Sequence, residues 1–274
     1  MIEILSAKFF QQGLLAGLLA SVAAGLLGPL VLANRMVFLA GGIAHAAFGG
    51  VGLGYYFRFD PTLGALGFSG LAATAMAWVE QAARERVETL VGALWAVGMA
   101  LGVVLLDATP GYKSEAFGYL FGSIVFVTRA DLLWLAAFDV VLLAAVALSY
   151  RQLLAASFDP VFARTRNVAT GLIRWMLVAA VAVAAILTMR VVGLILVLAL
   201  LTLPPAIAGL FCRDMRWQMF FAFLVAAVAV FVGMLLGWRF DQTSGASIVL
   251  VLALAYPVAY LLKRLLPRRR PAPA

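Results

Sequence analysis

Long apolar segments recur along the whole chain, and each approaches the length that a helix needs to cross a lipid bilayer. About 20 apolar residues are required, because an α-helix rises about 1.5 Å per residue and the hydrocarbon core is about 30 Å thick. A transmembrane β-barrel would instead show alternating segments of about ten residues. The predicted fold class is therefore all-α, a polytopic integral membrane protein with about nine transmembrane helices. The predicted spans are 9–33, 36–57, 61–79, 90–107, 132–150, 174–189, 191–211, 218–238 and 245–262.

Composition supports a membrane environment, since only 12% of the 274 residues are charged and 65% are hydrophobic. A soluble domain carries about 25% charged residues. No hydrophilic stretch is long enough for a second domain, so residues 1–262 are predicted to form one membrane domain, followed by a basic, Pro-rich cytosolic tail at 263–274. The first apolar segment is interpreted as a retained helix rather than a signal peptide, because so many spans follow it.

The net charge of +8 does not indicate nucleic-acid binding, because the basic residues lie in short loops and in the tail. Cytoplasmic loops of membrane proteins are enriched in Lys and Arg. With nine spans, this rule favours an outer N-terminus and an inner C-terminus. The segment 113–128 is ambiguous: if it crosses the membrane instead of dipping into it, the N-terminus changes side.

Glycines are frequent within the second and fourth spans, for example Gly49, Gly50, Gly52 and Gly98. Neither a strand nor a soluble helix accompanies them, so they do not form a dinucleotide-binding fingerprint. Small residues let transmembrane backbones approach closely, which predicts tight packing or a bend.

Two ionisable side chains are expected near the middle of predicted spans. His45, the one histidine, lies in the second span, and Asp139 lies in the fifth. Ionisable groups at that depth cost free energy and commonly mark transport paths. Neutral imidazole is also a common zinc ligand. His45 and Asp139 are therefore candidate metal ligands, although hydrogen bonds that join neighbouring helices would explain both residues as well.

The sequence has no nucleotide-binding or hydrolytic signature. It contains neither G-x-x-x-x-G-K-[ST] nor H-E-x-x-H, so catalysis by this chain is not expected. Cys212 is the single cysteine, which excludes an intrachain disulfide.

The predicted inner loop 151–173 contains the signals of a short helix. Asp159 followed by Pro160 is a favourable N-cap and first-turn pair, and Asn167 tolerates the left-handed conformation that ends helices. Phe162 offers apolar contact, and Arg164 adds positive charge. The segment fits either a docking element for a cytosolic partner or an interfacial helix on lipid headgroups.

Four sequence blocks stand out in order along the chain: Asn34–Phe38 with Ala44–Ala46; Tyr119–Gly122 with Val127, Thr128, Asp131 and Leu132; Asp159–Asn167; and Val192 and Gly193 with Leu200–Ala206. Together they resemble the permease subunits of ABC importers for zinc, manganese and iron, and the likeness covers residues 10–262. In the inner loop the matching positions include Asp159, Phe162, Ala163, Arg164 and Asn167.

The resemblance implies a permease homodimer, two cytosolic ATPase subunits that bind the ATP, and an outer metal-binding protein. The cargo would be a divalent metal ion, and no permanently bound cofactor is implied. His45 would line the metal path, and the 159–167 helix would couple the permease to the ATPase. The location would be the bacterial inner membrane, with lipid around the protein.

The chain departs from the family pattern at three positions. An aspartate usually stands four residues before the histidine, where this chain has Gly41; Ser123 replaces an acidic residue, and Asn167 replaces a glycine. We hypothesise that Asp139 supplies the missing carboxylate.

Three functions remain open from the sequence. The favoured one is an ATP-driven importer permease, with zinc ahead of manganese and iron. The alternatives are an ion-coupled secondary transporter that uses Asp139 and His45 as a proton relay, and a membrane scaffold in which these residues join helices.

Overall fold

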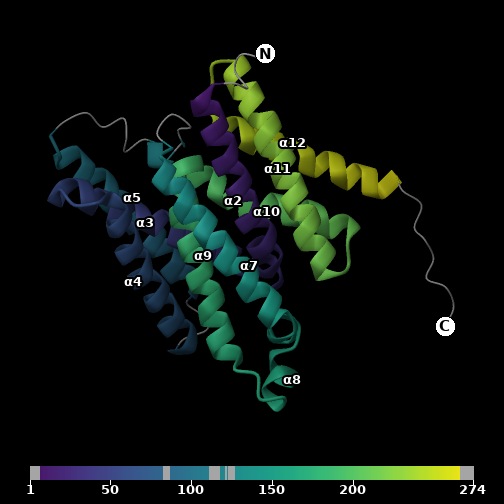
Figure 1. The fold of residues 1–274 in the computed structure, drawn as a ribbon. Helices are drawn as coiled ribbons and strands as arrows, with labels where there is room; N and C mark the ends of the chain where they lie inside the picture. Colours follow the sequence, from purple (N-terminus) through teal and green to yellow (C-terminus); the bar gives the residue numbers. More distant parts are fainter. Residues whose placement is uncertain (1–6, 83–86, 111–117, 121, 123–126, 266–274) are drawn as a thin grey trace.

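The computed structural model describes residues 7–82, 87–110, 118–120, 122 and 127–265 (Figure 1). Over these residues the chain is helical and contains no strand, which confirms the predicted fold class. Eight of the described helices are long and apolar enough to cross a membrane. The long helices are α2 (Lys8–Ala33), α3 (Val37–Phe57), α4 (Pro61–Ala82), α5 (Val87–Ala108), α7 (Arg129–Phe158), α9 (Thr170–Val192), α10 (Leu194–Phe211), α11 (Met215–Arg239) and α12 (Ser244–Leu265), and α8 (Pro160–Thr165) is short.

Each predicted span corresponds to one long helix, and two of these helices continue beyond the predicted spans. α7 continues to Phe158, so residues 151–158 are helical and do not belong to the inner loop. α12 continues to Leu265 and therefore takes up the first residues of the predicted tail. The remaining tail, and most of the ambiguous segment 113–128, lie outside the described residues.

α2 is the central helix of the bundle. It packs against α7, α9, α10 and α11, whereas α3 packs mainly between α4 and α5 on one side of the molecule (Figure 1). α2 buries small residues along its length, including Ala16, Ala20 and Ala24. A helix that is apolar on all sides belongs in the interior of a bundle, and α2 follows that rule.

Glycine contacts bring α3 close to its two neighbours. At Gly98 of α5, a Cβ atom would lie 2.6 Å from the Cα atom of Ala46. Gly50 and Gly64 face each other so closely that a Cβ on either would collide with the carbonyl oxygen of the other. Of the two explanations offered by the sequence, tight packing is therefore the one that the structure shows.

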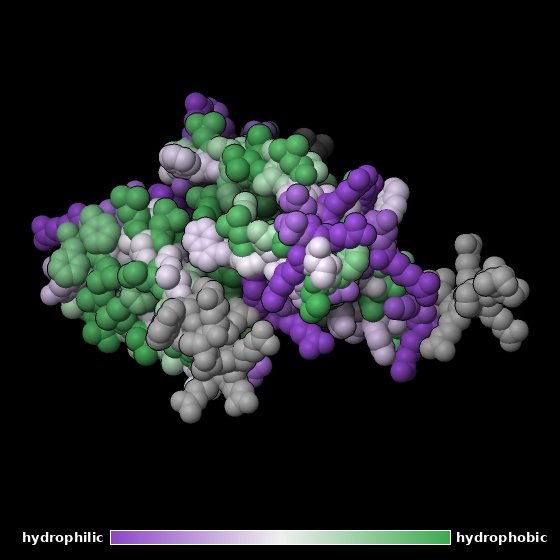
Figure 2. All heavy atoms as spheres, turned by 90° about the horizontal axis from the view of Figure 1, so that it is seen from below, coloured by the Kyte–Doolittle hydropathy of each residue, from purple (hydrophilic) through white to green (hydrophobic). Residues whose placement is uncertain are grey.

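The end that carries α8, seen in Figure 2, gathers hydrophilic residues beside hydrophobic flanks. At this end the last turns of α2 and α7 are joined, because the Asn34 side-chain amide donates to the hydroxyl of Ser157 at 2.9 Å. α2 begins at the opposite end (Figure 1).

Candidate metal path and coupling helix

His45 lies in the middle of α3 and is half-buried. Its Nδ1 atom is 2.8 Å from the carbonyl oxygen of Gly41, one turn earlier. A carbonyl oxygen can only accept, so Nδ1 must carry the hydrogen. In the neutral ring the lone pair is then on Nε2, and a backbone partner of this kind is what orients metal-binding imidazoles.

An aromatic group covers one face of this imidazole. The Trp95 ring of α5 stacks on His45 with 3.8 Å between ring centroids and an interplanar angle of 29°. Phe38 is 48% exposed, and the centre of its ring lies 6.1 Å from the centre of the Trp95 ring. Sequence analysis did not find Trp95, because its contact with His45 joins two helices that are far apart in the chain.

Trp95 also lies beside Gly41, the position where the family usually has an aspartate. A Cβ atom at Gly41 would lie 3.2 Å from Leu198 Cδ1 and 3.4 Å from Trp95 Cζ3. The space next to residue 41 is therefore bordered by a leucine and an indole. Glycine at this position therefore leaves no carboxylate one turn before His45.

Asp139 is placed in a different part of the bundle. It is only 6% exposed on α7, and neither carboxylate oxygen has a hydrogen-bond partner among the described residues. α7 packs mainly against α2 and α9, whereas α3 packs mainly against α4 and α5. Within the described part of the chain, no three His, Cys, Asp or Glu residues form a cluster that would hold a metal ion.

The predicted coupling segment forms the short helix α8, as the sequence indicated. The Asp159 carboxylate accepts a hydrogen bond from the Phe162 backbone N–H at 2.9 Å, and Pro160 occupies the first turn. Asn167 has a φ of 57°, in the left-handed region. Ala163 is fully buried while Phe162 is 52% exposed, so α8 is anchored on one side and open on the other.

Arginines flank this exposed surface. Arg164 donates through Nε to the Thr170 hydroxyl at 3.1 Å, which fixes α8 to the start of α9. The Arg166 guanidinium lies 5.4 Å from the centre of the Phe162 ring. α8 thus presents an aromatic ring between positive charges, a combination suited to a protein partner.

A cavity of about 980 Å³ lies at the same end of the bundle. It is bordered by Pro160 and Arg164 of α8, and by residues from the end of α2 and the start of α9. Charged and polar side chains around it include Asn34, Arg35, Glu88, Ser157 and Arg174. α8 therefore contributes one wall of this cavity.

At the opposite end, ionic and polar contacts join three helix ends. Arg190 of α9 forms an ion pair with Asp131 of α7, with 3.2 Å between Nη1 and Oδ1. Its Nη1 also donates to the hydroxyl of Thr62 on α4 at 3.3 Å. The backbone N–H of Thr62 donates to Asp60 at 2.7 Å, and this bond lowers the pKa of the Asp60 carboxyl.

Two of the sequence blocks meet here. Gly122, with a φ of 76°, packs so closely on the carbonyl of Val192 that no side chain would fit. Burial raises the pKa of the neighbouring Tyr119 hydroxyl. The described residues of the 119–132 block therefore form one structural unit with Val192 and Gly193, at the end of the bundle away from α8.

Comparisons with known proteins decide the family. A sequence profile of the ABC 3 transport family matches residues 6–263. An uncharacterized membrane protein of Synechocystis sp. is 45% identical to this chain over 96% of its length and 94% of the relative. The chain belongs to the ABC 3 transport family. The resemblance found in the sequence is thereby confirmed, as is a multi-pass location in the bacterial inner membrane.

Other similar proteins match nearly the same extent of the chain. The manganese transport system membrane protein MntC of Halalkalibacterium halodurans is 28% identical over 94% of this chain and 88% of its own. The solved structure of PsaBC from Streptococcus pneumoniae in complex with a Fab superimposes with a TM-score of 0.86. In that comparison 26% of residues are identical, and 95% of each chain is covered.

Proposed function

We propose that this chain is the permease of an ATP-driven importer for divalent transition-metal ions, and that it works as a homodimer. Separate ATPase subunits would bind at the α8 end, and an extracytoplasmic metal-binding protein would deliver the ion at the other end. The observation that carries the proposal is the orientation of His45, whose Nε2 lone pair is available in the middle of a transmembrane helix. The family membership and the metal-related names of the relatives support it.

His45 would bind the ion transiently. A transport site must bind strongly enough for entry and weakly enough for release. One imidazole supported by a backbone carbonyl, without a carboxylate one turn away, is a weak site of this kind. The exposed edge of α3 and α5, with Phe38 and Trp95, would face the second permease.

Asp139 would be a second polar group on the ion path, separate from His45. An isolated carboxylate at mid-bilayer depth is stable when it is protonated or when a cation accompanies it. Since α7 packs mainly against α2 and α9, and α3 mainly against α4 and α5, Asp139 would act on the passing ion apart from His45, or from the other protomer.

The residues around His45 favour zinc as cargo. Manganese prefers oxygen ligands, and imidazole suits zinc better. Gly41 removes the oxygen ligand that the family usually places near this ring. The relatives named for manganese favour manganese instead, so the uptake of both metals is to be measured.

The test is metal-stimulated ATP hydrolysis and metal uptake by the complex reconstituted with its ATPase and binding protein. His45→Ala and Asp139→Asn should reduce stimulated uptake at least tenfold and leave assembly intact. Thr74→Val, on the exposed side of α4, is the matched control and should behave as the unaltered chain does. Uptake without ATP would support the secondary transporter, and failure of His45→Ala to assemble would support the scaffold.

Zinc and manganese are compared in the same vesicles. Faster zinc uptake supports the assignment from the His45 surroundings. Manganese uptake with no response to zinc would overturn the choice of metal but leave the importer proposal intact.

A further inference from the structure

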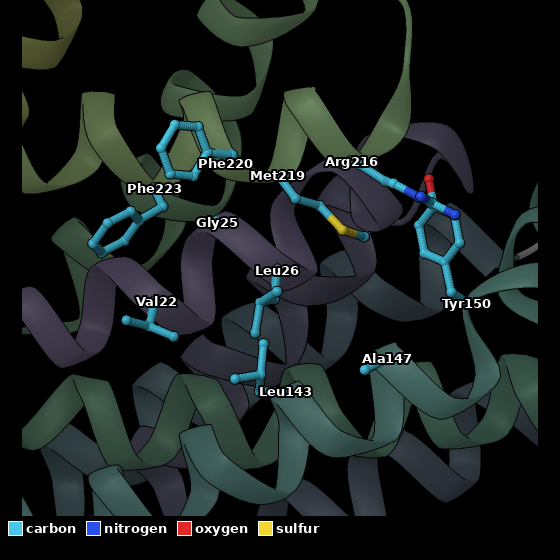
Figure 3. A pocket seen from close by; sticks show the side chains of 10 residues that line it. All are labelled: Val22, Gly25, Leu26, Leu143, Ala147, Tyr150, Arg216, Met219, Phe220 and Phe223. Carbon is cyan, nitrogen blue, oxygen red and sulfur yellow. The ribbon is translucent and has the colours of Figure 1, made fainter.

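A second cavity lies on the outside of the bundle, away from His45. It has a volume of about 560 Å³, within the roughly 300–1,000 Å³ of small-molecule sites. Its floor is α2 and its walls are α7 and α11, which both pack against α2 (Figure 3). At Gly25 a Cβ atom would lie 2.7 Å from Phe223 Cβ, so this glycine lets α11 approach the floor.

The groove is apolar along its length and cationic at one end. Val22, Leu26, Leu143 and Phe223 line the apolar part. At the end, the Arg216 guanidinium lies over the ring of Tyr150, 4.8 Å from its centre, as Figure 3 shows. Among the described residues, the one ion pair is that of Arg190 with Asp131, so no carboxylate pairs with this guanidinium there. The Asp214 carboxylate instead accepts a hydrogen bond from the backbone N–H of Arg216 at 2.8 Å and caps α11.

The length of α7 places the cationic end of the groove relative to the bilayer. At about 1.5 Å per residue, Tyr150 lies about 32 Å along α7 from Arg129, which is close to the thickness of the hydrocarbon core. Trp217, Phe220 and Phe221 form a cluster of exposed aromatic rings beside Arg216. Tryptophan is enriched at membrane–water interfaces. Arg216 therefore lies at headgroup level on the side of the bundle that carries α8.

We propose that the groove between α2, α7 and α11 binds one anionic glycerophospholipid, with the phosphate on Arg216 and an acyl chain over Gly25 and Leu26. Basic pockets between transmembrane helices on the cytoplasmic side are known to attract anionic headgroups. A second copy of the chain is a poorer occupant, because its apolar surface would bury the Arg216 guanidinium without an anion.

The experiment uses the full-length chain in nanodiscs that contain equal parts of phosphatidylglycerol and phosphatidylcholine, and native mass spectrometry counts the lipid that stays bound. One phosphatidylglycerol per chain should be retained. Arg216→Gln should weaken retention about tenfold, since a charge-assisted hydrogen bond is lost. Arg239→Gln, at the other end of α11, should retain the lipid.

A second pair of variants tests the apolar part. Ala147→Phe places a ring in the groove and should displace the lipid, while Ala144→Phe, which is exposed on α7 but does not line the groove, should not. Equal retention of phosphatidylcholine, or unchanged retention in both Arg216→Gln and Ala147→Phe, would overturn the proposal. Loss of a dimer in Ala147→Phe, with lipid retention unchanged, would instead identify a second copy as the occupant.

Discussion

The N-cap of α8 is the point where a small substitution should have the most selective effect. In Asp159→Ala the hydrogen bond from the Phe162 N–H to the carboxylate is lost. Removal of an Asp N-cap costs about 1 kcal/mol. A free-energy change of 1.4 kcal/mol corresponds to a factor of about ten in an equilibrium constant. The ratio of ordered to disordered α8 should therefore fall about fivefold.

Few other contacts compensate for this loss. α8 has six residues, and helices this short are not stable alone in water. Ala163 is its one fully buried residue, and the Arg164–Thr170 hydrogen bond is its one described side-chain link to α9. The cap is therefore a large share of what orders α8, although it is a negligible share of the stability of the whole bundle.

The assay is hydrogen exchange at residues 160–168, measured by mass spectrometry, together with the ratio of ATP hydrolysed to metal transported. Asp159→Ala should raise exchange about fivefold and increase the ATP used per ion, with no change in the melting temperature. Asp159→Asn should restore both values, because asparagine caps helices about as well as aspartate.

Asp214→Ala is the matched control. Asp214 caps α11 through the Arg216 N–H at 2.8 Å, so the same chemical group is removed. α11 has 25 residues packed against α2 and α12, and its exchange should change little. The reasoning would be refuted if both variants altered exchange equally, or if α8 exchanged at the same rate with and without its cap.

Other predictions concern packing and the end of the bundle away from α8. Gly98→Ala places a methyl group against the Ala46 backbone and should destabilise the protein by about 1–3 kcal/mol in thermal denaturation, whereas Gly67→Ala, with open space around it, should be tolerated. Arg190→Gln removes the partner of Asp131, whose side chain is 9% exposed, and should lower stability by about 1 kcal/mol; Arg239→Gln is the control. Because the pKa of Asp60 is lowered in the folded protein, its carboxylate stabilises the fold. This stabilisation is complete above the ordinary pKa of 3.8 and is lost as the pH falls through the lowered pKa of the folded protein. Asp60→Asn should therefore remove the acid-side dependence of hydrogen exchange at the start of α4.

The sequence predicted those features whose cause is local. Apolar runs located the long helices, and the Asp159–Pro160 pair with Asn167 located α8, because caps and left-handed residues act within a few positions. The stacking of Trp95 on His45 was not predictable, since it depends on how α3 and α5 pack. For the same reason, nothing in the sequence indicated that α7 would pack mainly against helices other than α3, which separates Asp139 from His45.

The extension of α7 was missed for a different reason. Residues 151–158 include Arg151, Gln152 and Ser157, so they lack the apolar signal of a membrane span. That signal reports contact with lipid and not helicity. A helix that continues into water is polar where it leaves the bilayer, and it looks like a loop in the sequence.

This extension bears on the two interpretations of α8. With 30 residues, α7 is about 45 Å long, whereas the hydrocarbon core is about 30 Å thick and the whole bilayer about 40–45 Å. Asp131 is paired with Arg190 at the end away from α8, so the excess length lies mainly at the α8 end. A tilt of about 20° shortens the projection by only a few ångströms. α8 therefore lies at or beyond the headgroup layer on its side of the membrane, where the exposed Val161 and Phe162 cannot reach acyl chains. Apolar side chains held in water between arginines need a protein surface to cover them, which favours a docking element over a helix that rests on lipid.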